Sequence, residues 1–368
     1  MSIVEMAIRA GRLVCPKTKM RLALHTRETA EAKMGHRLMV LRGSSSFNDC
    51  TEVLVREDCR VAYPVSGGTP VLMVPEMLGK EGTSSGCDLG DPRYAEAYEE
   101  MDHYNEVATW EAAHIRDSSA YATVERTHRA LDGQLSSFPN PIEVWLDATY
   151  DCAAQWDAYN HIAPLKGKRI LQLGGKGIHA VKFLIGGADE TWLVTPMIGE
   201  LRCAMALARE FGVADRLGCV VAIGEELPFA SNAFDGVYCG GCLHHMVVDL
   251  ASKEVERVLR EGGRFSAVEP WRAPLYAAGT RVFGKREEAV HCRPLTQERV
   301  KPMYHVFRQA RVIQHGTLTR YPLLALMKLG IRSSLPSVWR INAVDDAVCS
   351  CIPKMRDMGS SVACLGTK

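Results

Sequence analysis

The chain has 368 residues, of which 47% are hydrophobic and 24% charged, so about two domains with sizeable cores are expected. Lysine and arginine number 44 and aspartate and glutamate 43, so no bulk charge draws the chain to nucleic acid or to a membrane. Its 13 irregularly spaced cysteines suit a reducing, cytoplasmic compartment better than a disulfide framework. We expect no signal peptide, and no apolar run approaches the roughly 18 residues of a membrane-spanning helix.

Residues 1–78 are predicted to form a small β-rich module. Proline and glycine punctuate its short apolar runs, of which Tyr63–Val65 and Thr69–Met73 are plausible edge strands. Leu13–Pro16 and Cys59–Met73 resemble the start and the end of the zinc-ribbon-like module of the Trm112 type. That resemblance implies a structural zinc ion held by two Cys-x-x-Cys pairs.

Only half of the zinc ligands of that family are present. Aligned on the motif, the four ligand positions are Cys15, Thr18, Arg56 and Cys59. Two thiolates do not close a structural site that needs four ligands, and Cys50 has the wrong spacing to replace one. We therefore expect no zinc, and a module stabilised by its own strands and by docking onto the rest of the chain.

Residues 79–165 are predicted to be a linker followed by a helical cap. Gly79–Gly90 is rich in glycine and serine, whereas Pro92–Asp132 and Ile142–Ile162 carry apolar and aromatic residues at helical spacing. Aromatic residues at this spacing usually pack a helix onto its neighbours, so most of them are assigned to the core.

Residues 166–368 are predicted to form an α/β domain, because apolar runs alternate with helix-period segments. The first five predicted strands are Arg169–Leu173, Thr191–Thr195, Cys219–Ile223, Phe234–Cys239 and Arg264–Glu269. Parallel strands need long crossovers, so this alternation predicts a parallel sheet with helices on both faces. Such sheets bind ligands at the carboxyl ends of their strands, near the change in strand order.

Four stretches of this domain resemble the small-molecule branch of the class I S-adenosylmethionine-dependent methyltransferases. They are the turn Gly174–Gly177 after the first strand, Glu225–Phe229 with Asn232–Tyr238, Leu243–Met246 after the fourth strand, and Val258–Phe265 before the fifth. The resemblance implies a Rossmann-like seven-stranded sheet and S-adenosylmethionine as cofactor. Strands six and seven would be Arg311–Thr317 and Ser361–Leu365, with a helical insertion at 321–358 that could be a lid or an oligomer contact.

In this family the cofactor's amino-acid end lies at a glycine-rich turn, where backbone can approach a ligand closely. The turn here has Lys176 and Ile178 at two positions where the family has glycine. His179 lies in the first turn of the following helix, whose amides remain available to an anion. This histidine could contact the cofactor carboxylate, or it could simply cap the helix or face solvent.

Two carboxylates of the family pattern are also missing. Strand two usually ends in an acid that binds the ribose, but here it ends at Thr195 and the next carboxylate is Glu200, a turn too late unless the loop folds back. The family's adenine-binding aspartate is replaced by Ile223, or by Gly224 if the loop shifts. The residues expected to contact the cofactor are Gly174, Gly175, Gly177, His179, Thr195, Ile223, Gly224, Glu225, Leu227 and Cys239.

Catalytic candidates follow strands four and five. His244 or His245 could act as a general base, since imidazole titrates near neutral pH, although His244 could equally pack under the sheet. Glu269 could bind substrate or orient a histidine. We expect no metal site, because adjacent histidines should point in different directions and no third ligand is suitably spaced.

The resemblance implies that helices before strand one and the segment after strand five shape the acceptor pocket. For Pro270–Arg293, a solvated surface loop and helix is the alternative. The side chains considered as substrate contacts are Tyr150, Trp156, Tyr159, Trp271, Arg272, Tyr276, His291 and Arg293.

We predict S-adenosylmethionine-dependent methyl transfer to a small-molecule acceptor, by a chain that binds neither nucleic acid nor membrane and could form a homodimer. Because three cofactor signatures are altered, the alternative is the same fold with non-methylating chemistry or binding. An RNA methyltransferase is the third hypothesis, suggested by the zinc-ribbon-like module. The neutral charge and the incomplete ligand set argue against it.

Overall fold

A computed structural model of the chain describes nine stretches. They are residues 2–34, 39–41, 50–73, 78–80, 104–131, 137–147, 151–274, 293–331 and 334–368. The predictions for Tyr150, Tyr276 and His291, and for most of the linker, lie outside the described residues.

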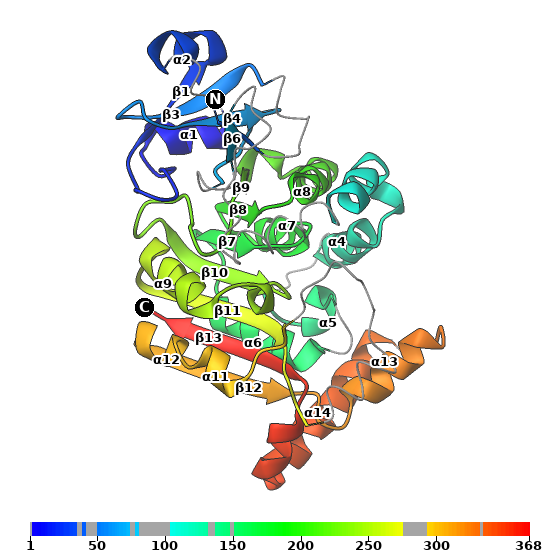
Figure 1. The fold of residues 1–368 in the computed structure, drawn as a ribbon. Helices are drawn as coiled ribbons and strands as arrows, with labels where there is room; N and C mark the ends of the chain where they lie inside the picture. The colour runs from blue at the N-terminus through cyan, green and yellow to red at the C-terminus, as the bar shows by residue number, and fades with distance from the viewer. Residues whose placement is uncertain are drawn as a thin grey trace.

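A seven-stranded sheet forms the centre of the molecule (Figure 1). Its strands in chain order are β7 (Arg169–Leu173), β8 (Glu190–Thr195), β9 (Leu217–Val221), β10 (Phe234–Gly240), β11 (Leu259–Pro270), β12 (Gln309–His315) and β13 (Ser361–Thr367). The spatial order is β12-β13-β11-β10-β7-β8-β9, and β13 runs antiparallel to both of its neighbours. The predicted Rossmann-like α/β fold is therefore confirmed.

Several predicted strand boundaries in this sheet are wrong. β9 and β12 each begin and end two residues earlier than predicted; the chain leaves the sheet after Val221, and Ile223 lines a cavity. α9 (Val248–Val258) ends directly before β11, which begins at Leu259 and not at Arg264. Leu259 pairs with Phe234, and a register shift then absorbs the residues up to Arg264.

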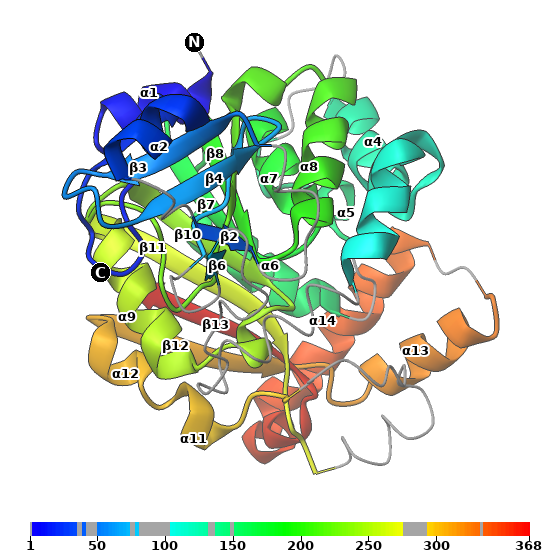
Figure 2. The same cartoon turned by 45° about the horizontal axis from the view of Figure 1, so that its top comes forward.

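Helices cover both faces of the sheet (Figures 1 and 2). On one face lie α4 (Ser119–Leu131), α6 (Cys152–Ile162), α7 (Ile178–Ile185) and α8 (Ile198–Glu210). On the other lie α9, α11 (Gln297–Val300) and α12 (Met303–Val306). The apolar face of α6 belongs to a second core cluster, and the other helices pack with the buried strands in the largest one. Both faces of the sheet are therefore covered, which leaves the ends of the strands for a site.

The two long helices predicted before β7 are each interrupted. Residues 104–113 are helical, then η3 (Ile115–Asp117) separates them from α4, whose first turn is capped by the Ser118 hydroxyl at 3.0 Å from the amide of Tyr121. The second segment divides into α5 (Ile142–Trp145) and α6. These breaks let the chain turn back over the carboxyl ends of the strands.

The N-terminal module contains helices as well as the predicted strands. Its antiparallel sheet has the order β1-β3-β4-β5, and β2 pairs with β6. The elements are α1 (Ile3–Arg9), β1 (Leu22–Thr26), α2 (Arg27–Met34), β2 (Met39–Leu41), β3 (Glu52–Arg56), β4 (Ala62–Ser66), β5 (Thr69–Pro70) and β6 (Leu78–Lys80). The interpretation as β-rich missed α1, although its capping box of Ser2 and Glu5 is readable in the sequence.

This module docks on the free edge of the large sheet. The amide of Leu72 donates to the carbonyl of Val221 at 2.7 Å, and the amide of Val14 donates to the carbonyl of Pro228 at 3.0 Å. Buried apolar residues of both parts, including Tyr63 and Phe229, belong to one continuous cluster. The module thus covers an edge strand that would otherwise be open to pairing with another chain.

At the zinc-ligand positions of the module the structure shows an ion pair. Arg56 pairs with Asp58 at 2.7 Å, and its guanidinium lies 3.9 Å from the thiol of Cys15. Cys15 is buried while Cys59 is exposed. Among the residues that the structure describes, no group of three or more His, Cys, Asp or Glu side chains is arranged to hold a metal ion.

The predicted insertion between β12 and β13 is helical. It consists of α13 (Arg320–Lys328), α14 (Leu335–Cys351) and η7 (Pro353–Met358), which extend away from the N-terminal module (Figure 1). Over the described parts of the chain, none of the helices combines the length and the apolar character needed to cross a membrane.

Candidate active site

A cavity of about 250 Å³ opens at the carboxyl ends of β7, β8, β9 and β10. The strand order reverses between β7 and β10, so the cavity lies at the switch point where sheets of this kind bind ligands. The predicted site residues that line it are Gly174, Gly175, Thr195, Ile223, Gly224, Glu225 and His245. Residues that the sequence analysis selected near the ends of all four strands therefore line one cavity.

The glycine turn works by close approach of backbone segments. Gly174 has φ +69°, and a Cβ on it would lie 2.2 Å from the sulfur of Cys242, in the loop after β10. Gly177 does not line the cavity; a Cβ there would lie 2.3 Å from that of Ala204. Gly177 therefore allows α7 to pack on α8. Lys176, at a position where the family has glycine, pairs with Glu111 at 2.6 Å and ties the turn to the helix at 104–113.

A carboxylate stands at the end of β8 after all. Glu200 lies in the first turn of α8, lines the cavity and is only 6% exposed. The hydroxyl of Thr195 donates to its Oε2 at 2.8 Å, which orients the carboxylate. Of the two alternatives for Glu200, the structure shows the one in which the loop after β8 folds back and brings α8 against the strand end.

Glu269 anchors the loop after β10. It is 2% exposed and accepts a hydrogen bond from the amide of Leu243 at 2.8 Å. Its Oε2 lies 2.7 Å from Nδ1 of His244, which is itself buried and does not line the cavity. Of the two roles considered for Glu269, the geometry supports the orienting of a histidine.

The two adjacent histidines lie together. The ring centroids of His244 and His245 are 3.9 Å apart, but His244 turns to Glu269. Both belong to the 3₁₀ turn η6 (Leu243–His245), in which neighbouring side chains differ in direction by about 120°. His245 is the one that lines the cavity.

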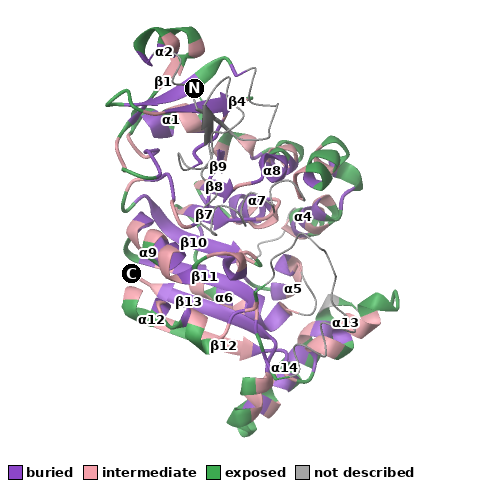
Figure 3. Ribbon diagram, in the orientation of Figure 1, coloured by how far each residue is buried: buried purple, intermediate pink, exposed green. Residues whose placement is uncertain are grey.

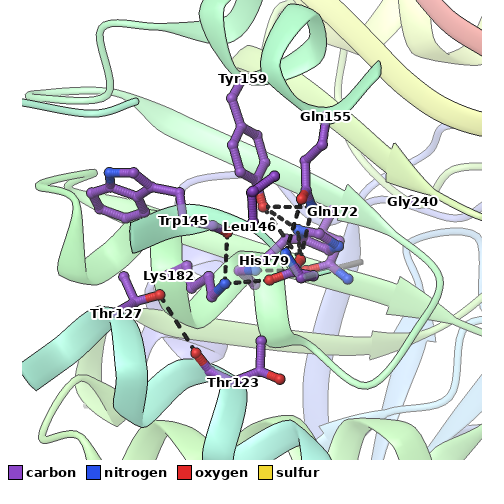
Figure 4. A network of polar contacts seen from close by, with 12 residues as sticks. Thr123, Thr127, Trp145, Leu146, Gln155, Tyr159, Gln172, His179, Lys182 and Gly240 are labelled. Carbon is purple, nitrogen blue, oxygen red and sulfur yellow. Dashed lines mark hydrogen bonds and ion pairs between the residues drawn. The ribbon is translucent and has the colours of Figure 1, made fainter. Parts of the chain in front are cut away.

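His179 belongs to a buried polar network rather than to the cavity lining (Figure 4). Its Nδ1 lies 2.7 Å from the hydroxyl of Tyr159 and 3.0 Å from Oδ2 of Asp147. The fully buried Lys182 donates to the same carboxylate, and Gln155 accepts the amide of Asp147 at 2.9 Å. Burial alone would raise the pKa of Asp147, but Lys182 and His179 hold that pKa well below its ordinary value.

This network lies directly behind the cavity wall at Gly240. A Cβ on Gly240 would lie 3.0 Å from Nε2 of His179, so glycine lets the imidazole approach the end of β10. Tyr159, expected as a substrate contact, is fully buried in the network. Its ring packs between α6 and the sheet, against Phe183 and Tyr238. Neither His179 nor Tyr159 lines the cavity, although both support its wall.

Other predicted contacts also lie away from the cavity. Leu227 and Cys239 are fully buried in the core. Trp156 packs against Trp339 of α14, with ring centroids 5.8 Å apart. Trp271 is buried, whereas the side chains of Arg272 and Arg293 are exposed; none of these three lines the cavity.

Sequence reasoning missed several residues of the cavity. Gly240 and Gly241 form a second glycine pair opposite Gly174 and Gly175, and this repeat was visible in the sequence. Met246 lines the cavity, and a Cβ on Gly224 would lie 2.5 Å from its sulfur. Tyr104 comes from the helix at 104–113, whose place over the strand ends no local pattern indicates.

A sequence model described as "Methyltransferase domain" matches residues 195–267. The ubiquinone/menaquinone biosynthesis C-methyltransferase UbiE of Haemophilus ducreyi is 32% identical over 130 residues, which are 34% of this chain and 47% of that protein. The tRNA U34 carboxymethyltransferase of Methylococcus capsulatus is 32% identical over 105 residues, 28% of this chain and 32% of that protein. The chain spans about half the length, or less, of these curated relatives.

Solved structures with a similar fold include the geranyl diphosphate C-methyltransferase of Streptomyces coelicolor A3(2). It is 15% identical, with a TM-score of 0.43, and the similarity covers 58% of this chain and 78% of that one. The [4+2]-cyclase SpnF is 24% identical, with a TM-score of 0.39 and coverage of 59% and 80%.

The matched model agrees with the predicted methyltransferase domain over residues 195–267, and the similar proteins support S-adenosylmethionine as the cofactor. Because each match covers only part of the chain, the activity of the whole chain is a proposal.

Proposed function

We propose that this chain is an S-adenosylmethionine-dependent methyltransferase with a small-molecule acceptor. The observation that carries the proposal is the cavity at the β7/β10 switch point, between two glycine pairs and beside the oriented carboxylate of Glu200. When bound, the cofactor supplies an electrophilic methyl group on a sulfonium. The rest of the chemistry falls to the chain's own residues.

The residues of the cavity match the parts of this cofactor. Glu200, held by Thr195, would accept the ribose hydroxyls, which a carboxylate binds more strongly than a neutral acceptor does. Ile223 and Met246 offer apolar walls to a purine ring in place of the family's aspartate. The Gly174–Gly175 backbone leaves room for the amino-acid end.

His245 is the proposed proton acceptor. It lines the cavity, so an acceptor hydroxyl, amine or carbon acid held there could pass its proton to an imidazole nitrogen. Glu269 and His244 act as positioning residues, because their hydrogen bonds fix the turn that carries His245. Rate acceleration would come mainly from holding the acceptor in line and from excluding water.

A small-molecule acceptor is supported by the relatives named as quinone-biosynthesis C-methyltransferases. The N-terminal module, similar in sequence to the Trm112 type, is proposed to protect the sheet edge by docking rather than to bind zinc. A cytoplasmic location, a homodimer and the absence of a nucleic-acid partner remain predictions.

Calorimetric titration with S-adenosylhomocysteine tests the proposal. We expect micromolar binding by the native chain, and Glu200→Gln should weaken it by roughly tenfold to a hundredfold, since a hydrogen bond to a charged group contributes about 1.5–3 kcal/mol. Glu210→Gln, at the exposed end of the same helix, is the matched control and should bind normally. No heat from the native chain at millimolar ligand would overturn the proposed cofactor.

A further inference from the structure

The polarity of α14 departs from that of an ordinary surface helix. A surface helix normally buries an apolar stripe and exposes its charges. In α14 the buried side mixes apolar Val338 and Cys349 with polar Asn342 and Asp345, whereas Val344 is 64% and Ile341 43% exposed. Arg340 is the one charged residue among the exposed described positions of this helix.

Exposed residues are frequent along α13 and α14 (Figure 3), and many of them are apolar. Of the twelve large hydrophobic side chains that are exposed in the described residues, seven lie between 318 and 352. At the end of α13 and just after it, Met327 is 53%, Leu329 74% and Ile331 52% exposed. We call the exposed side chains of residues 318–354 the α13–α14 surface. Exposed apolar side chains that gather in one region commonly mark a site that binds another protein or a membrane.

The charges around this surface indicate what the partner is. Lys328, Arg340 and Lys354 are exposed, and Asp357 just beyond is the one exposed acid that the described residues of α13, α14 and η7 carry. The other two acids are held by the protein: Asp345 accepts the amides of Thr317 and Leu318 at 2.9 Å, and Asp346 bonds to His315. Apolar side chains bordered by cations are complementary to an anionic lipid surface.

A second copy of the chain fits this surface less well. In a two-fold symmetric dimer this cation-bordered surface would face the same surface of the second copy, and Asp357 is the one exposed acid that the described residues of α13, α14 and η7 offer to pair with the cations. The position of the insertion in the fold also supports docking on a membrane. The insertion begins after the carboxyl end of β12, so it stands at the same edge of the sheet as the cavity (Figures 1 and 2).

We propose that the α13–α14 surface docks on an anionic lipid bilayer, with Met327, Leu329, Ile331 and Val344 at the level of the headgroups and acyl chains and with Lys328, Arg340 and Lys354 on the anionic headgroups. This proposal departs from the expectation from net charge that the chain has no membrane partner, because an overall charge of +1 does not describe how the charges are distributed locally. Docking there would bring the cavity edge to the membrane, so an apolar acceptor could enter from the lipid. That last step rests on the proposed function, whereas the docking does not.

Flotation of the full chain with vesicles tests the docking. We expect binding to vesicles that contain phosphatidylglycerol, little binding to pure phosphatidylcholine, and a loss of binding between about 0.1 and 0.5 M salt. The double variant Met327→Glu/Val344→Glu should bind at least tenfold more weakly. The matched control Met6→Glu/Val107→Glu carries the same changes at side chains that are 41% and 50% exposed elsewhere, and it should bind like the native chain.

Three results would overturn the docking. They are equal binding to both kinds of vesicle, an equal loss in the control variant, or a native dimer that Met327→Glu/Val344→Glu dissociates while no vesicle binding is seen. Circular dichroism and binding of S-adenosylhomocysteine, measured on each variant without lipid, show that the fold and the cofactor site are intact. A native chain that floats with vesicles but binds no cofactor would refute the proposed function and leave the docking standing.

Discussion

At the scale of single residues, the site depends on glycines, because a residue without a side chain lets neighbouring groups approach closely. Gly174 lets the loops after β7 and β10 meet, and Gly240 lets His179 approach the strand end. Polar side chains then orient one another: Thr195 holds Glu200, and Glu269 holds His244. These contacts replace parts of the family pattern that the linear sequence lacks.

Gly174→Ala should weaken S-adenosylhomocysteine binding by at least tenfold. The new Cβ would lie 2.2 Å from the sulfur of Cys242, so the loop after β10 must move. Gly212→Ala is the matched control: Gly212 has nearly the same φ, +67° against +69°, but nothing lies within 4 Å of its added Cβ. Both variants should lose about 1 kcal/mol of unfolding free energy from backbone strain. Equal binding by the two, measured by calorimetry, would contradict this role of Gly174.

At the scale of elements, one histidine joins three of them. His315, at the end of β12, lies 2.8 Å from Asp157 of α6 and 3.0 Å from Asp346 of α14. Burial disfavours the charged imidazole, but the hydrogen bonds to Asp157 and Asp346 raise the pKa of His315 to about 9. Arg356 of η7, 4.0 Å from Asp346, completes the group. The proposed membrane-docking insertion is therefore held to the sheet by a titratable contact.

The attachment of α14 should weaken at alkaline pH. A histidine whose pKa is raised on folding stabilises the fold fully below its unfolded pKa of about 6.5, and this stabilisation is lost as the pH rises through about 9. With a discount for the partly exposed carboxylates, the loss is on the order of 2 kcal/mol. Amide hydrogen exchange of α14, corrected for intrinsic rates, should therefore accelerate between about pH 6 and pH 9.5. His315→Asn should abolish this dependence and exposed His305→Asn should keep it; the same slope in both would refute the account.

At the scale of the whole molecule, the N-terminal module and the α/β domain share one core. Backbone hydrogen bonds from Val14 and Leu72 reach the large sheet, and the buried cluster runs from Tyr63 to Phe229 without a break. Two bodies with a continuous apolar core lose their stabilisation together when either one opens. The module therefore contributes to the stability of the domain that carries the site.

Leu72→Ala should destabilise the chain by about 2–5 kcal/mol, because Leu72 is fully buried at the junction. Unfolding in denaturant should remain a single transition. Tryptophan fluorescence reports the region outside the module, since all six tryptophans follow residue 78, and hydrogen exchange of residues 2–34 reports the module. Leu329→Ala, at a side chain that is 74% exposed, is the control and should change stability by less than about 0.5 kcal/mol. A module that unfolds at lower denaturant than the fluorescence transition would contradict the shared core.

Much of the architecture followed from local pattern. The periods of the apolar residues predicted the five parallel strands of the large sheet, and the family resemblance added β12 and β13; β7 has the predicted ends. Turn glycines and the residues after each strand placed the cavity correctly, because parallel strands bring their carboxyl ends to one edge. These features depend on neighbours within a few residues, so the sequence alone determines them.

The chemistry of the site was decided by contacts between distant residues. Glu200 reaches the cavity only because the loop after β8 folds back, and His179 turns away from it because Tyr159 of α6 and Asp147, just after α5, hold its ring. The exposure of Val344 likewise depends on which side of α14 packs against α6. The spacing of apolar residues indicates that one face of a helix will be buried, but only the tertiary packing decides which element covers that face. For that reason the fold could be predicted from the sequence, while the working side chains and the outward apolar surface emerged only from the tertiary structure.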